Sequence, residues 1–379
     1  MRPLVPVLLL LALACGGSGS TNPGGGTPGT GTGGDPWAPV TAAIEAAKPQ
    51  FSAGVALEVI TPAGVVYSSA STAPGSFDDT ADTAVASASK WISATVLLRL
   101  VDQGVLSLDT KTKDLLVDRN GQPWSGNLGE ATLRHLMSFT TGISGDNDRS
   151  EQTLQLSEAV YRIYEDAAPT ASVPGSYFYY GSTHLRIAAR MAEVKTGKTW
   201  AQLFDEQLRV PLGWASTSNY GITGNPNPAG TLSCTGREYL RFLAMELRGG
   251  LDGGTRILPA SLLAEERKDQ YGPGTTIAYS PFVQAQNKAY HYGLCNWLEV
   301  PNASAPPSIS NPIVRVSSTG KFGWAPWVSM DGSYAGLILA RQPITVLYGA
   351  VPSENLKVQL DPLIRAALAT NPPVIRTIP

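Results

Sequence analysis

The spacing of apolar positions predicts one long buried helix near residue 90. In "VASASKWISATVLLRLVDQG", Ile92, Val96 and Leu100 recur at four-residue intervals, and further apolar residues widen this stripe. The glycine at the end of the stretch is a typical helix stop. Residues three apart lie on one face of a helix, so the pattern places Ser87 beside Lys90 at the helix N-terminus.

Other patterned segments predict a sheet assembled from both ends of the chain. Early strand-like runs, "AGVALEVI" and "VVYSS", flank the turn "TPAG", and late runs are "YHYGLCNWLEV", "PIVRVSS", "YAGLILAR" and "ITVLYG". Helical segments are expected at Val40–Lys48, Thr132–Ser138, Gln152–Asp166, His184–Lys195 and Glu354–Leu368. We therefore expect an α/β (α+β) fold, in which an antiparallel sheet built from both chain ends is flanked by helices and carries an inserted, mainly helical lobe.

The N-terminal segment differs from the rest of the chain. Residues 1–15, "MRPLVPVLLLLALAC", have the apolar run of an export signal and are too short to span a bilayer. "ALAC" resembles a lipoprotein signal with Cys15 as the acylated residue, whereas "ALA" also fits ordinary secretion. Residues 16–36 are glycine-rich and form a flexible linker with a reach of about 25 Å. We expect an exported protein whose folded domain spans residues 37–372. It would be anchored through Cys15 and face the periplasm or cell exterior.

Composition restricts the function classes. The 379 residues are 43% apolar, with a net charge of −2 and no long charge run, so the chain is globular and has no electrostatic footprint for nucleic acid. Cys234 and Cys295 remain after the signal, and either a disulfide or, as we favour, two buried free thiols would fit them. Cysteine and histidine spacings offer no metal site, and no cofactor is expected.

Ser87 and Lys90 are a candidate nucleophile and base. The usual serine–histidine route is poorly supported, because no G-x-S-x-G elbow occurs and His135, His184 and His291 read as packed structural residues. A lysine base must be largely neutral, which requires its pKa to fall by ~3 units, or ~4 kcal/mol, as burial can provide. The alternative is a capping serine beside a lysine that only reaches water.

Two other segments carry hydroxyl groups of interest. In "SYFYYGSTH", Tyr180 precedes a glycine that allows close approach and Ser182, so it is a candidate proton shuttle. A second S-x-x-K, Ser318 to Lys321, runs into "FGWAPW" and cannot begin a helix.

Together these motifs resemble the serine β-lactamase and penicillin-binding-protein family, which includes class C β-lactamases, D-alanine carboxypeptidases and related carboxylesterases. "SASK" matches S-x-x-K, Tyr180-Gly181-Ser182 is similar to Y-x-N or Y-x-S, and "VKTGKTW" continues the pattern. "TLRHLMSFTTGI" resembles H-L-x-x-H-T-S-G, with Phe139 at the second histidine. The similarity covers most of residues 37–369.

The third family motif, K-x-G or H-x-G, is where the chain departs. Its best match is Ser318-Thr319-Gly320, and Lys321-Phe322-Gly323 is the rival register. The first register lacks the cation that binds a substrate carboxylate. Trp324 follows closely and is a candidate wall of the cleft, with ordinary core packing as the alternative.

The resemblance implies a β-lactamase/transpeptidase-like fold and an acyl-enzyme on Ser87, with Lys90 and Tyr180 sharing the proton transfers. It also implies an oxyanion site at the N–H groups of Ser87 and Lys321. The expected substrate-binding and oxyanion residues are Ser182, Ser318, Thr319, Gly320, Lys321 and Trp324.

We expect an exported serine hydrolase of carboxylesterase type, acting on a small ester or amide. The alternatives are a β-lactamase or D-alanyl-D-alanine carboxypeptidase on the same residues and, from another class, a non-catalytic binding or sensor domain. Contact with a membrane is expected only through Cys15, and the oligomeric state is left open.

Overall fold

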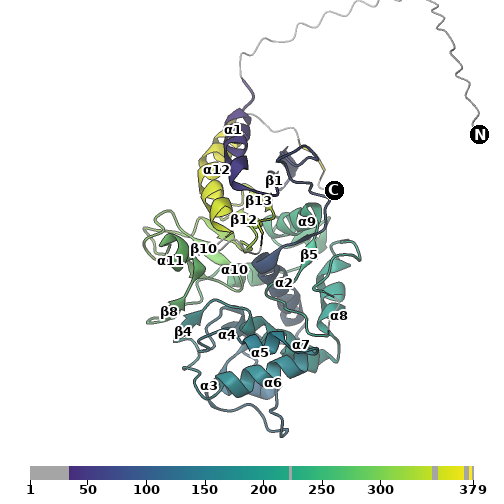
Figure 1. Ribbon diagram of the computed structural model, residues 1–379, viewed down its shortest axis with the longest axis vertical. Helices are drawn as coiled ribbons and strands as arrows, with labels where there is room; N and C mark the ends of the chain where they lie inside the picture. The colour runs from purple at the N-terminus through teal and green to yellow at the C-terminus, as the bar shows by residue number, and fades with distance from the viewer. Residues whose placement is uncertain (1–33, 222–223, 344–348, 371–374, 378–379) are drawn as a thin grey trace, which may run out of the picture. The chain divides into compact units, whose positions relative to one another are not determined.

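The computed structural model describes residues 34–221, 224–343, 349–370 and 375–377 (Figure 1). The expected export signal, Cys15 and nearly all of the linker lie outside the described residues, as does most of "ITVLYG". The chain divides into two units, Met1–Asp35 and Pro36–Pro379, and every described helix and strand belongs to the second unit.

The main sheet has strand order β2-β1-β13-β12-β11-β10-β9, and every neighbouring pair is antiparallel. Its register pairs Val55 with Ala340, so an early and a late strand are neighbours in one antiparallel sheet, and the prediction of a sheet built from both chain ends is confirmed. The strands are β1 (Val55–Thr61), β2 (Gly64–Ser68), β9 (His291–Tyr292), β10 (Trp297–Glu299), β11 (Arg315–Ser317), β12 (Ala325–Ser329) and β13 (Ala335–Ala340).

Alternate residues of β1 face two different cores. Val55 and Leu57 pack with α1 (Ala38–Ala47) and α12 (Val351–Thr370), which lie side by side in Figure 1. Ala56 and Ile60 belong to the larger core, which includes α2 (Ser89–Asp102) and α9 (Gly236–Leu247). Every residue of β13 is buried, because helices cover both faces of this central strand.

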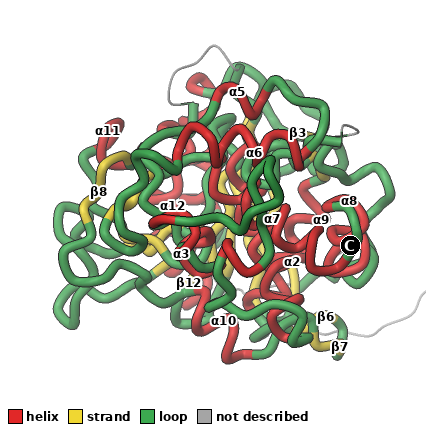
Figure 2. Tube along the Cα trace, turned by 90° about the horizontal axis from the view of Figure 1, so that it is seen from below, coloured by secondary structure: helices red, strands yellow, loops and turns green. Residues whose placement is uncertain are grey.

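Along the chain, the expected helical lobe lies between β3 (Thr83–Ala84) and β8 (Thr276–Tyr279). Most of its helices gather in the lower part of Figure 1, and Figure 2 draws them in red. Its helices are α3 (Gly126–Glu130), α4 (Leu133–Met137), α5 (Asp148–Glu151), α6 (Leu156–Ala167), α7 (Thr183–Thr196) and α8 (Trp200–Phe204). The remaining elements are α10 (Ala260–Glu266), α11 (Pro281–Gln286), β4 (Tyr177–Tyr179), β5 (Ser233–Cys234), β6 (Leu251–Asp252) and β7 (Thr255–Arg256).

The prediction of one helix over Gln152–Asp166 is wrong at its start. Gln155 is extended and pairs with Gly224, so α6 begins only at Leu156. Tertiary pairing overrides the helical pattern here. Among the described residues, no helix combines the length and apolar character that crossing a bilayer requires.

Candidate active site

Ser87 lies in a single 3₁₀ turn, Ala86–Ala88, immediately before α2. Ala88 is the N-cap of that helix, so Ser87 does not take the capping role that the sequence also allowed. The preceding residue, Ala86, has φ of +48°, a left-handed conformation that is costly for a residue with a side chain. The Ser89 hydroxyl bonds to the Ala86 carbonyl at 2.5 Å and helps to hold this turn.

Lys90 is buried and lies against the nucleophile. Its Nζ is 3.0 Å from Ser87 Oγ and donates to the Ala229 carbonyl at 2.8 Å. Burial lowers the pKa of Lys90 to about 8, although the negative charge of Asp146 opposes this shift. The side chain is therefore partly neutral near physiological pH and can accept the Ser87 proton.

Tyr180 forms the other side of this group. Lys90 Nζ lies 4.6 Å from the centre of its ring, which stacks on Trp297 at 5.0 Å. Burial raises the pKa of Tyr180, and a hydrogen bond with Ser87 only partly opposes the shift. The phenol is therefore protonated at neutral pH and can donate to an oxygen bound at Ser87.

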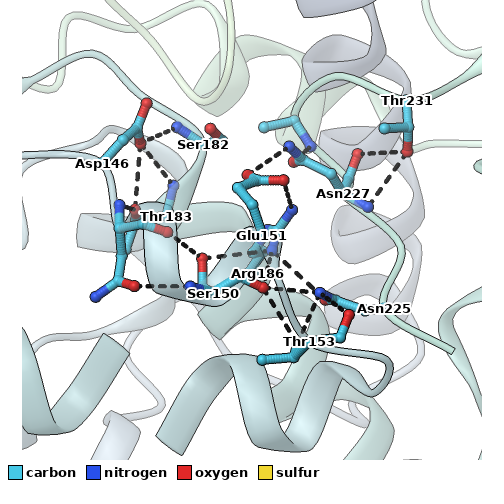
Figure 3. Close-up of polar contacts among 12 residues, drawn as sticks. Asp146, Ser150, Glu151, Thr153, Ser182, Thr183, Arg186, Asn225, Asn227 and Thr231 are labelled. Atoms are coloured by element: carbon cyan, nitrogen blue, oxygen red, sulfur yellow. Dashed lines mark hydrogen bonds and ion pairs between the residues drawn. The ribbon is translucent and has the colours of Figure 1, made fainter. Parts of the chain in front are cut away.

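A polar network holds the loop that carries Ala229 (Figure 3). Asn225 Nδ2 donates to the Ser150 carbonyl and to Thr153 Oγ1, both at 2.8 Å. The buried Arg186 also donates to the Ser150 carbonyl, at 3.0 Å, and pairs with Glu151. These contacts join α5 and α7 to the loop after residue 224, and the loop in turn docks on α2 through Lys90.

Ser182 precedes α7, where Asp146 supplies the acceptor for the helix N-terminus. Asp146 Oδ1 accepts from Ser182 N at 2.6 Å and from Thr183 N at 3.1 Å (Figure 3). A side chain at Gly181 would meet this carboxylate at 2.4 Å, so the glycine lets Asp146 approach. Asp146, Gly181 and Ser182 all line the same cavity as Ser87.

The third motif runs directly beside the nucleophile. A Cβ at Gly320 would lie 2.1 Å from the Val85 carbonyl, so only glycine allows this approach. Thr319 Oγ1 donates to Glu354 of α12, and both residues line the cavity. Lys321 also lines the cavity, and it is exposed.

Two expected substrate contacts lie elsewhere. Ser318 is 2% exposed, and its hydroxyl donates to the Ser87 carbonyl at 3.2 Å instead of facing the cavity. Trp324 was expected to wall the cleft, and this is wrong: it is 0% exposed and packs edge-on against Phe77 and Tyr239. The chain turns sharply after Lys321 and directs this ring into the core.

The cavity has a volume of about 400 Å³. Its charged lining groups are Lys90, Asp146, Lys321 and Glu354. Sequence reasoning missed several of its residues, namely Asp146, Tyr279, Phe282, Trp297 and Glu354. Only Trp297 lay in a predicted strand, and no local motif marks the other four.

The histidines and cysteines have structural surroundings. Burial lowers the pKa of His184 to about 4, and its ring stacks on Phe139 at 5.0 Å. His135 belongs to the N-terminal cap of α4, and His291 bonds to Asp269 at 2.6 Å. Cys234 and Cys295 are buried free thiols, so they form no disulfide.

Comparisons with known proteins agree with this geometry. The family model described as Beta-lactamase matches residues 42–341. Penicillin-binding protein 4 of Amycolatopsis lactamdurans is 28% identical over 57% of this chain and 63% of its own length. The Esterase/beta-lactamase LipL of Mycobacterium tuberculosis is 32% identical over 34% of this chain and 29% of its own length. The chain thus spans less than two thirds of these curated relatives.

A solved structure extends the match to the whole fold. The crystal structure of a putative beta-lactamase from Bacteroides dorei has a TM-score of 0.69 and 25% identity, and it covers 85% of this chain and 98% of its own. With Ser87 in the turn before α2 and Lys90 on the first turn of that helix, these matches show that the chain belongs to the beta-lactamase family and has its fold.

Proposed function

We propose that this protein hydrolyses small neutral esters through an acyl-enzyme on Ser87. The observation that carries the proposal is the buried Lys90, whose Nζ lies 3.0 Å from Ser87 Oγ and whose pKa is lowered to about 8. A capping serine beside a solvated lysine would have neither property. The similarity to a protein named as an esterase and beta-lactamase supports the same reaction class.

In the proposed mechanism, neutral Lys90 takes the Ser87 proton as Oγ attacks the ester carbonyl. The backbone N–H groups of Ser87 and Lys321 would stabilise the oxyanion, since Gly320 packs directly against the Val85 carbonyl, two residues before Ser87. Tyr180 then donates its proton to the leaving alcohol, and the protonated Lys90 returns a proton to Tyr180. Water attacks the acyl-enzyme with Lys90 as base, which releases the acid and regenerates Ser87.

Neutral substrates are favoured over β-lactams because the third motif begins with Ser318, whose hydroxyl donates to the Ser87 carbonyl instead of facing the cavity. A cation at this position would form a charge-assisted bond to a substrate carboxylate worth roughly 1.5 to 3 kcal/mol, and Ser318 does not replace that bond. That loss lowers selectivity for anions by about 10-fold to 100-fold. Activity as a β-lactamase or D-alanyl-D-alanine carboxypeptidase is the second candidate, favoured by the penicillin-binding relative and by Lys321 in the cavity lining.

We also propose that the protein is exported and anchored by a lipid on Cys15. The apolar run of residues 4–13 and the glycine-rich segment after it support this. Mass spectrometry of membrane fractions tests it, because Cys15→Ser should leave an unlipidated chain.

Intact-mass spectrometry with p-nitrophenyl esters and a penicillin tests the activity. We expect an acyl adduct on Ser87 and a higher kcat/KM for neutral esters than for penicillin. Ser318→Lys should reduce the difference in kcat/KM between neutral esters and penicillin. More efficient penicillin hydrolysis, or selective loss of carboxylate substrates in Lys321→Ala, would overturn the esterase assignment in favour of the rival register. No labelling by a fluorophosphonate would favour a non-catalytic binding domain.

A further inference from the structure

The contact between Thr319 and Glu354 determines what the third motif offers a substrate. Thr319 Oγ1 donates to Glu354 Oε1. A hydroxyl has a single proton and a carboxylate only accepts, so the Thr319 proton is committed to Glu354. What Thr319 presents to the cavity is therefore its lone pairs.

Glu354 is fixed in this role by a buried ion-pair network. Lys357, which is 0% exposed, contacts both carboxylate oxygens of Glu354 at 2.9 Å and also pairs with Glu299. Arg315 pairs with Glu299 at 3.0 Å and with Asp361 at 3.1 Å on the other side. Lys357 is thus the buried counter-ion that Glu354 shares with Glu299.

Glu354 itself does not reach a substrate, because its side chain is 0% exposed and Oε2 lies 2.9 Å from Lys357 Nζ. Thr319 lines the cavity, one residue beyond Ser318, whose hydroxyl donates to the Ser87 carbonyl. The acceptor at this point of the cavity is therefore the Thr319 hydroxyl, whose proton Glu354 holds.

We propose that Thr319, whose proton is held by Glu354, forms an acceptor subsite that selects substrates carrying an N–H or O–H donor and disfavours substrates carrying a carboxylate there. This inference rests on the proposed esterase function and adds a substrate class to it. A carboxylate placed against Thr319 would meet an oxygen that has no proton to donate and would gain no hydrogen bond there, whereas an amide or hydroxyl group would gain one.

Two matched series of esters test the subsite. The first consists of 3-carbamoylphenyl, 3-carboxyphenyl and 3-methylphenyl acetate, which share one acetyl-enzyme, so that kcat/KM compares acylation alone. The second places the same three groups on the acyl side, as p-nitrophenyl 4-substituted benzoates. In the series whose variable group reaches Thr319, the wild type should prefer carbamoyl over carboxy by about 10-fold beyond the intrinsic reactivity ratio measured in buffer.

Glu354→Gln reverses the polarity of the subsite. Its amide oxygen can stay against Lys357 while its NH₂ donates to Thr319, which frees the Thr319 proton for the cavity. The carbamoyl preference should then fall to about 2-fold or less, through a gain on the carboxy ester. Thr319→Val should remove the preference, measured as the ratio of kcat/KM for the carbamoyl and carboxy esters so that a general change in activity cancels, and it keeps the test valid if Glu354→Gln misfolds.

Asp146→Asn is the matched control, since it also removes a carboxylate from the cavity lining but leaves Thr319 unchanged. An equal change in the carbamoyl-to-carboxy ratio in Asp146→Asn would show a simple charge effect and overturn the inference. If the wild type hydrolyses the methyl esters but does not distinguish carbamoyl from carboxy esters, the subsite alone would be overturned. No turnover of any ester would overturn the proposed function and the subsite with it.

Discussion

Lys90 Nζ lies between Ser87 Oγ at 3.0 Å and the Ala229 carbonyl at 2.8 Å. A neutral amine has two N–H bonds and one lone pair. When one N–H points at the Ala229 carbonyl, the lone pair can face the Ser87 hydroxyl, which is the geometry a base needs. The carbonyl therefore orients the base as well as anchoring it.

Ser87→Ala should abolish ester hydrolysis, whereas Ser89→Ala should retain it. Ser89 bonds to the Ala86 carbonyl and accepts from Leu232 N at 3.1 Å, so its loss should lower the free energy of unfolding by about 1 to 3 kcal/mol. Steady-state assays and urea melts measure the two effects. Turnover retained in Ser87→Ala would rule out the proposed nucleophile.

Lys90→Arg should lower kcat/KM by at least about 10²-fold, because arginine keeps the charge but cannot act as a base. A fluorophosphonate labelling rate measures the same loss at the acylation step alone. If Lys90→Arg is labelled at the wild-type rate, Lys90 serves only as a positive charge.

The pH dependence of kcat/KM should report Lys90. Its folded-state pKa is lowered to about 8 by burial, and the active form is neutral, so log kcat/KM should rise with pH and level off above about 8. Tyr180 does not limit this range, because burial raises its pKa. A profile that is flat from pH 6 to 9 would contradict the assignment.

The local parts of this site were predictable, and the distant parts were not. Ser87 and Lys90 lie three residues apart where a 3₁₀ turn runs into α2, so the three-residue spacing in the sequence was enough to predict their contact. Glu354 and Asp146 join the cavity only because α12 and the loop before α5 pack around it, and no spacing along the chain encodes that. Trp324 shows the converse, since its place beside the third motif in sequence suggested a contact that one sharp turn prevents.

Asn225→Ala tests whether the loop network positions the base. Loss of its bonds to Ser150 and Thr153 should lower the free energy of unfolding by about 1 to 3 kcal/mol and lower kcat. If the Ala229 carbonyl moves away, the charged form of Lys90 loses an acceptor, so its pKa should fall and the pH profile should shift to lower pH. Asn127→Ala, an exposed asparagine bonded to Ala171, is the control and should leave the profile unchanged. An unshifted profile in Asn225→Ala would assign Asn225 a purely structural role.

Glu58 should make the fold less stable as pH rises. Burial in β1 raises its pKa to about 8 from 4.5, despite a hydrogen bond from Ser68 at 2.6 Å. The folded state thus binds the extra proton between these values, and stability falls by up to about 1.4 kcal/mol per pH unit across that window. The melting temperature of Glu58→Gln should exceed that of the wild type by an amount that grows from pH 5 to pH 8. A melting difference that does not vary with pH would contradict this.

The pairing of Val55 with Ala340 also sets the order of assembly. During synthesis, β1 leaves the ribosome long before its central partner β13, and its edge stays unpaired meanwhile. Helices of the lobe need only nearby residues and can form first, whereas the sheet must await nearly the whole chain. A nascent chain that stops before β13 would therefore expose the unpaired backbone N–H and C=O groups of β1 to other chains. Premature termination is thus expected to promote aggregation.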